Sequence, residues 1–156
     1  MFVGMFFLLA LVVLIGLYIY FELKVRRVMR QDPVQIAARW WAERLRRPAA
    51  HHTGSESGLW LTIAAGREEG IVDAAIARFE KCLARQIAES IVINRFYPDL
   101  KVDYCPEDLL VKAAEQAEIK VSLNLPSKTL MLIRPDRVEV ACGYQSEFET
   151  LWSKAA

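Results

Sequence analysis

The chain has 156 residues, of which 54% are hydrophobic, and its formal net charge is +1. The charge is unevenly spread: residues 22–47 hold eight Lys/Arg against three Asp/Glu, whereas residues 48–156 hold twelve against sixteen. An acidic remainder repels phosphates, which disfavours general nucleic-acid binding, and the basic segment points to an anionic surface.

The N-terminal run contains no charged side chain from Phe2 to Phe21. As a helix it is about 30 Å long, which matches the hydrocarbon thickness of a bilayer. Tyr18 and Tyr20 lie at its end, as residues of an aromatic belt do. The alternative, a cleaved secretory signal, requires a basic start, a shorter apolar core and a small-residue cleavage site, which this run lacks. We therefore expect residues 1–22 to form a retained transmembrane helix.

Basic residues crowd the C-terminal flank of this run. They are Lys24, Arg26, Arg27 and Arg30. Positive charge stays on the cytoplasmic side of a membrane, so we expect the N-terminus outside and the remaining chain in the cytoplasm. Each cation near anionic headgroups contributes about 1 kcal/mol to membrane binding. Three widely spaced cysteines suit a reducing compartment, and together these features predict a single-pass inner-membrane protein. The richness in Ala and Arg favours a bacterial membrane.

Residues 23–47 are expected to form a basic, amphipathic juxtamembrane helix, with Asp32-Pro33 as a helix start and Pro48 as its end. At 100° per residue the apolar side chains form two strips. The first strip is Val34, Ala37, Ala38, Trp41 and Leu45; the second is Ile36 and Trp40.

Two apolar strips predict a helix that is contacted from both sides. We assign Trp41 to the membrane interface and Ile36 with Trp40 to partner docking, so that the helix acts as a strut between anchor and domain. A nucleic-acid helix would gather its basic residues on one face, but here they surround the helix. In a further alternative, both tryptophans are ordinary core residues of the domain.

Residues 48–58 read as a linker or loop, and residues 59–156 as a cytoplasmic α+β domain. We expect helices packed on a three-strand antiparallel meander, in two layers. The expected helices cover residues 69–96, a stretch opened by Pro106, and a short C-terminal segment with a capping box at Ser146 and Glu149. The expected strands are 119–125, 129–134 and 138–142.

The sequence contains no recognisable catalytic, cofactor or metal site. His51 and His52 are adjacent in the expected loop, and no Cys-x-x-Cys or His-x-x-x-His pair is present. Cys82 and Cys142 fall on apolar faces, where a cysteine is usually a small buried hydrophobe. Acidic residues flank expected helix N-termini, where they stabilise the helix dipole.

These features predict a non-enzymatic structural or adaptor subunit of a larger membrane assembly, of the transport or secretion type, which contacts lipid and other protein subunits. Two alternatives stay open. One is a membrane-tethered sensor or regulator that binds a ligand or anionic lipid through the basic segment; the other is an enzyme with an unfamiliar site.

Overall fold

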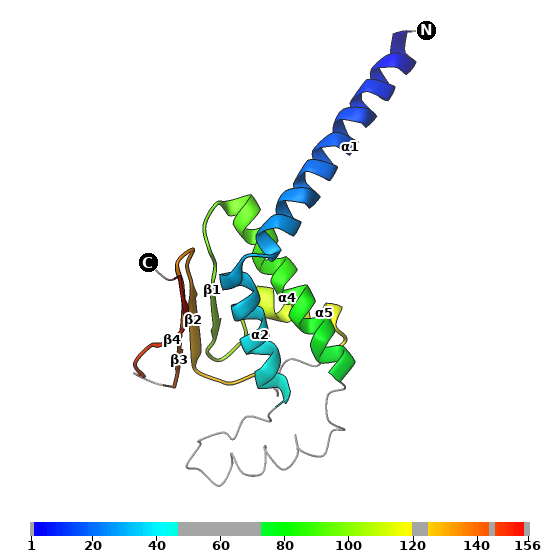
Figure 1. The fold of residues 1–156 in the computed structure, drawn as a ribbon. Helices are drawn as coiled ribbons and strands as arrows, with labels where there is room; N and C mark the ends of the chain where they lie inside the picture. Colours follow the sequence, from blue (N-terminus) through cyan, green and yellow to red (C-terminus); the bar gives the residue numbers. More distant parts are fainter. Residues whose placement is uncertain (1, 47–72, 120–124, 144–145, 155–156) are drawn as a thin grey trace.

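A computed structural model describes residues 2–46, 73–119, 125–143 and 146–154. In these described residues, four helices and a four-stranded sheet make an α+β fold from which the N-terminal helix projects (Figure 1). The helices are α1 (Phe2–Met29), α2 (Asp32–Arg46), α4 (Asp73–Asn94) and α5 (Asp108–Gln116). The strands are β1 (Asp99–Val102), β2 (Thr129–Ile133), β3 (Arg137–Cys142) and β4 (Glu149–Ser153).

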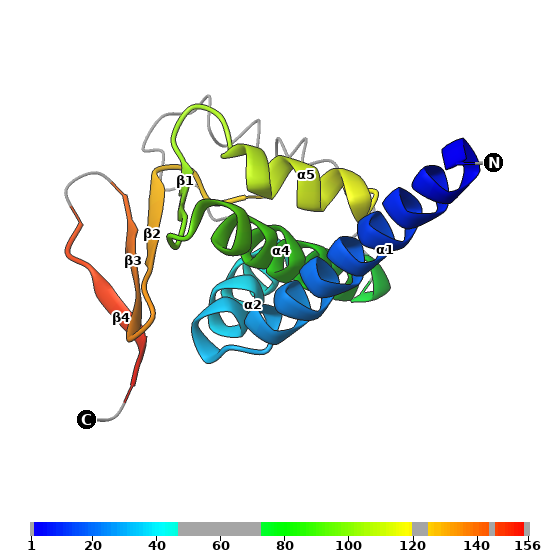
Figure 2. The same ribbon diagram turned by 90° about the horizontal axis from the view of Figure 1, so that it is seen from above.

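The domain has two layers, with the sheet on one side and α2, α4 and α5 on the other (Figure 2). The strands are antiparallel and lie in the order β1-β2-β3-β4, so every hydrogen-bonded neighbour is also a neighbour in sequence order. Helix α2 lies against β2, β3 and β4 on one side and against α4 on the other. The predicted α+β class is confirmed, but the sheet has four strands rather than three.

The strands differ from the prediction at both ends of the sheet. β2 and β3 occupy two of the three expected positions, and their alternating burial matches the alternating sequence. The expected strand at 119–125 lies largely outside the described residues. Its place beside β2 is taken by β1, where Leu100 and Val102 point inward.

The expected C-terminal helix is wrong, because Glu149–Ser153 is strand β4 and pairs with β3. The hydroxyl of Ser146 donates to the carbonyl oxygen of Cys142, 2.6 Å away, and caps no helix. The open edge of β3 offers this segment backbone partners at once, whereas a helix there would first have to be nucleated.

The hydrophobic core joins the three domain helices to the inner face of the sheet. Its largest fully buried side chains include Trp41 of α2, Phe79 and Leu83 of α4, Leu110 of α5 and Met131 of β2. All five residues of the first apolar strip, which the helical projection placed on one face, are buried. Helix α2 is therefore part of the domain, which extends the domain N-terminally from the expected start at residue 59. The expected linker at 48–58 lies outside the described residues.

Candidate membrane and partner-binding site

Helix α1 contains the longest apolar stretch of the structure. Within the described chain, Leu8–Met29 is the single segment long and apolar enough to cross a membrane. The large apolar side chains from Leu8 to Tyr20 are about half to two-thirds exposed, so this part of α1 has no protein partner in the fold. A core helix would bury the same side chains, and their exposure marks α1 as a possible membrane span.

The last two turns of α1 lie against the domain. Val25 is 1% exposed, and α1 packs across α4 in this region. On α4 the side chains of Ala84 and Ala88 are buried, and small residues of this kind let two helices approach closely. Ala74 and Ala77, at the other end of α4, are exposed.

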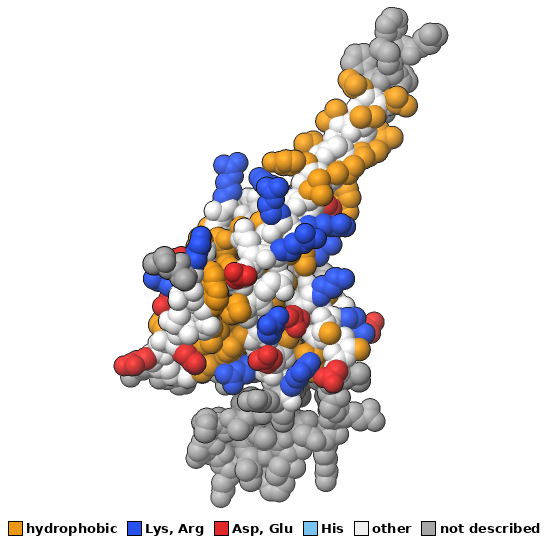
Figure 3. Space-filling view, in the orientation of Figure 1, with side chains coloured by type: hydrophobic (Ala, Val, Ile, Leu, Met, Phe, Trp, Pro, Cys, Tyr) orange, Lys and Arg blue, Asp and Glu red, His pale blue; other side chains and the backbone are white. Residues whose placement is uncertain are grey.

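The predicted membrane-interface cations surround the foot of α1, where it leaves the domain (Figure 3). Lys24, Arg26, Arg27 and Arg30 are all exposed. The ammonium group of Lys24 lies 5.5 Å from the ring centroid of Tyr20, a cation–π distance. The three arginines of this group also line a shallow hollow, together with Leu23.

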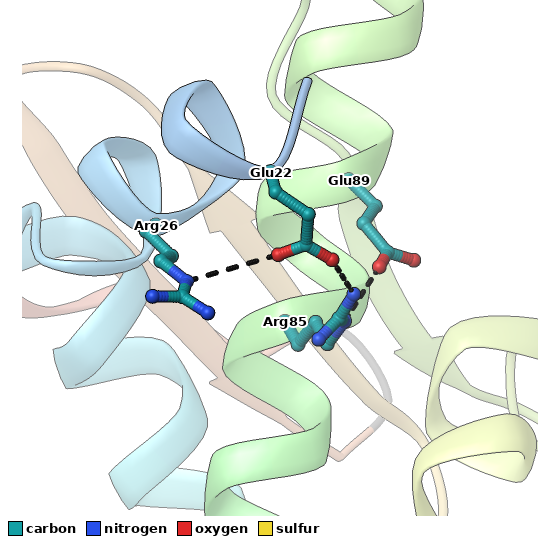
Figure 4. A network of polar contacts seen from close by, with 4 residues as sticks. All are labelled: Glu22, Arg26, Arg85 and Glu89. Carbon is teal, nitrogen blue, oxygen red and sulfur yellow. Dashed lines mark hydrogen bonds and ion pairs between the residues drawn. The ribbon is translucent and has the colours of Figure 1, made fainter. Parts of the chain in front are cut away.

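A polar network ties the foot of α1 to α4 (Figure 4). The carboxylate of Glu22 lies 3.8 Å from Arg26 on its own helix and accepts a hydrogen bond from the Arg85 guanidinium of α4. Arg85 also donates to Glu89, 2.7 Å away. Hydrogen bonds to Glu89 and Glu22 raise the pKa of the Arg85 guanidinium, which keeps its charge. The network therefore adds a polar contact beside the buried packing of Val25 at this junction.

A second contact involves the elbow, by which we mean residues 30–31 between α1 and α2. The phenol of Tyr97, which follows α4, donates to the side-chain oxygen of Gln31 at 2.7 Å. Burial raises the pKa of the Tyr97 phenol, so it stays a neutral donor. The end of α4 is thus held next to the elbow, and Gln31 follows directly on Arg30.

The two adjacent tryptophans of α2 have different environments. Trp41 is fully buried in the core, so its expected place at a membrane interface is wrong in this fold; the core alternative describes it. Its position on the first apolar strip, between α4 and the sheet, leaves no face for lipid. Trp40 is half-buried, meets Trp41 edge-to-face at 5.0 Å, and carries the Arg44 guanidinium 4.6 Å above its ring.

Helix α2 and strand β4 together present an apolar seam, which we define as Ile36, Trp40, Leu151 and Trp152. All four side chains are half-buried and pack on the edge of the core. Helix α2 contacts β4, and on α2 the exposed Arg39 forms an ion pair with Glu80 of α4 at 3.7 Å. A strip of hydrophobic side chains is visible between the sheet and the helices (Figure 3).

Chemistry-bearing side chains do not converge in the described part of the chain. No group of three His, Cys, Asp or Glu residues there is arranged to hold a metal ion. All three cysteines are free thiols; Cys82 is half-buried, and Cys142 is exposed rather than buried as expected. Cys142 is the last residue of β3, where the strand leaves the core. His51 and His52 lie outside the described residues.

Charged residues in or next to strands β1, β2 and β3 form surface ion pairs. Arg134 bonds to Asp99 at 2.7 Å, Arg137 lies 3.1 Å from Glu139, and Lys128 pairs with Asp103. Exposed pairs of this kind contribute little to stability and carry no sign of a ligand site.

Sequence reasoning missed Arg85 and Glu89 as residues of the junction. Their spacing of four on one helix is readable in the sequence, but it predicts only a local ion pair. The partner Glu22 lies 63 positions away from Arg85, and no local pattern reveals that contact. No model of a known protein family matches this chain, and no curated protein matches it in sequence. The function is therefore inferred from the arrangement of the residues themselves.

Proposed function

We propose that this protein is a non-enzymatic structural or adaptor subunit of a larger bacterial inner-membrane assembly, of the transport or secretion type. One observation carries the proposal: α1 runs without a break from an exposed apolar stretch into turns that are packed on the domain, with Val25 buried. A subunit that must hold a domain at a fixed angle to the bilayer needs such a stiff junction. A tethered enzyme can work on a flexible linker.

In this proposal α1 is the anchor, with its N-terminus outside and the domain in the cytoplasm. The charge distribution supports that orientation, because the exposed cations lie only at the domain end of the apolar stretch. Free thiols at all three cysteines suit a reducing compartment. Lys24, Arg26, Arg27 and Arg30 then lie among anionic headgroups.

The apolar seam is the proposed binding site for another protein subunit. Half-buried aromatic residues at the edge of a core are typical anchors of protein interfaces. The seam also adjoins β4, the last strand of the sheet order, whose outer edge has no neighbour among the described strands. A partner segment can add backbone hydrogen bonds there while its apolar side chains fill the seam.

Trp40→Ala tests this proposal, because the substitution removes the largest half-buried ring of the seam on α2. We expect the variant to insert into the membrane normally but to lose partner subunits. The measurement is mass photometry of the full chain extracted gently from its native membrane, with co-purifying proteins identified by mass spectrometry. Tyr104→Ala is the matched control, because it removes an exposed aromatic ring outside the seam.

A discrete large particle with stoichiometric partners, lost in Trp40→Ala and kept in Tyr104→Ala, would support the adaptor proposal. A bare monomer or dimer of the unsubstituted chain would contradict it. That result would favour the sensor or the enzyme, which ligand and activity screens would then separate.

A further inference from the structure

Exposed apolar side chains are rare in the domain. Outside α1, the large apolar residues exposed in the described chain are Ile93, Phe96, Tyr104 and Phe148. Two of them lie three positions apart at the end of α4, where Ile93 is 66% and Phe96 is 62% exposed. We call residues 93–96 the α4 tip. Its exposed apolar side chains are not part of the hydrophobic core.

The α4 tip lies beside the foot of α1. Helix α4 rises across α1 and ends on the side of the domain from which α1 projects (Figure 1). The backbone turns at Arg95, whose φ of 63° ends the helix, and Tyr97 then bonds to Gln31 in the elbow. This bond holds the tip in place next to Arg30, the last cation of the basic flank.

The charges around the tip favour an anionic surface. Arg95 is exposed, and the sequence has no acidic residue between Glu89 and Asp99. Those two carboxylates are already occupied, Glu89 by Arg85 and Asp99 by Arg134, each at 2.7 Å. The tip thus joins two exposed apolar side chains to a cation, beside a helix foot that carries four more cations.

We propose that the α4 tip is a second membrane contact, in which Ile93 and Phe96 enter the interface of the leaflet from which α1 emerges. Arg95 binds the headgroup phosphates of the same leaflet. Apolar side chains flanked by cations lie about 5–10 Å into the boundary between headgroups and acyl chains. A lipid surface fits better than a protein partner, because the tip lies next to the apolar stretch and shares its basic surroundings.

A second contact changes what the anchor does. With α1 alone, the helix and the domain packed on it can tilt together in the bilayer, whereas α1 plus the α4 tip limits this tilt and defines which face of the domain meets the membrane. The apolar seam would then be presented at a fixed height. The inference rests on α1 spanning a bilayer, as in the proposed function, and requires no protein partner.

The test measures the depth of position 96 in a bilayer free of other proteins. The full chain, with Cys82, Cys105 and Cys142 replaced by alanine, carries Phe96→Cys with a nitroxide label in nanodiscs of phosphatidylcholine and phosphatidylglycerol. Electron paramagnetic resonance compares accessibility to oxygen, which concentrates in lipid, with accessibility to a water-soluble nickel complex. Tyr104→Cys, beyond the far end of β1, is the aqueous reference, and Leu14→Cys in α1 is the lipid reference.

We expect the oxygen-to-nickel ratio at position 96 to be severalfold higher than at position 104 and lower than at position 14. Equal ratios at 96 and 104, with position 14 in lipid, would overturn the second contact and leave the anchor intact. An aqueous ratio at position 14 would overturn both the anchor and the second contact. Loss of partner subunits in native membranes does not affect this depth measurement. The adaptor role and the second contact can therefore be contradicted independently.

Discussion

Helices α1 and α2 follow one another in the chain and are both rich in apolar residues, yet they have opposite environments. From Leu8 to Tyr20 the large side chains of α1 are exposed, whereas α2 buries seven of its residues in the domain. Composition explains the difference. The upper part of α1 is apolar on every side, and α2 alternates apolar strips with charged residues. Basic residues therefore mark the end of the exposed apolar stretch, but they do not make α2 a second such stretch.

The largest effect is expected in α2. Trp41→Ala should lower the free energy of unfolding of the domain by about 3–5 kcal/mol, because it removes a fully buried aromatic side chain and leaves a cavity. Urea denaturation in detergent, followed by tryptophan fluorescence, measures this loss. Trp40→Ala should cost clearly less, since Trp40 is half-buried. Equal losses for the two variants would remove the distinction between core and seam.

A substitution in the exposed stretch of α1 should not change the stability of the domain. Leu14→Lys places a charge in the middle of the exposed apolar stretch and should disfavour membrane insertion by about 3 kcal/mol. Alkaline carbonate extraction of membranes measures the released fraction, which should rise. The urea midpoint of the domain should stay unchanged, and a shifted midpoint would mean that this part of α1 packs on protein.

The boundary between the two environments should fall near residue 25. Val25→Asp buries a carboxylate in the contact between α1 and α4 and should cost about 3 kcal/mol of stability or more, because an unpaired buried charge costs more than a neutral polar group. Lys24→Asp, one position earlier and exposed, is the control for adding an acidic residue at the foot of α1. If both variants unfold at the same urea concentration, α1 does not pack on the domain there.

The smallest effect is expected at the elbow. Tyr97→Phe removes one hydrogen bond and should cost about 0.5–1.5 kcal/mol at neutral pH. Because burial raises the pKa of Tyr97, the folded state holds its proton more tightly than the unfolded state. That contribution is present below about pH 10, the ordinary value for tyrosine, and is lost as the pH rises through the raised pKa. The free energy of unfolding, measured from pH 8 to 11, should thus fall more steeply with pH in the unsubstituted chain than in the variant.

Local pattern was enough for the elements with a strong period. The apolar strips of α2, the long helix α4 and the pair β2–β3 could be predicted because side-chain spacing alone determines which side chains share a face. Strand β4 could not. Phe148, Leu151 and Trp152 fit helical spacing equally well, and only the free edge of β3 decides for a strand.

The candidate site was predictable only in part, for the same reason. The cations at the foot of α1 are adjacent in sequence and could be read directly. Trp41 and Trp40 share one helix, but which strip faces the core depends on the docking of α4 and the sheet. The junction of Glu22 with Arg85 and the position of Phe96 depend on contacts between residues that are far apart in the chain.

The orientation of the domain relative to the membrane tests the proposed function most directly. Trypsin digestion of inverted inner-membrane vesicles and of right-side-out spheroplasts, with an antibody against the C-terminus, reports which side carries the domain. We expect the C-terminal epitope to be cleaved in the inverted vesicles and protected in the spheroplasts. Cleavage in spheroplasts with protection in inverted vesicles would contradict a cytoplasmic domain, and with it the assignment of the seam to cytoplasmic partners.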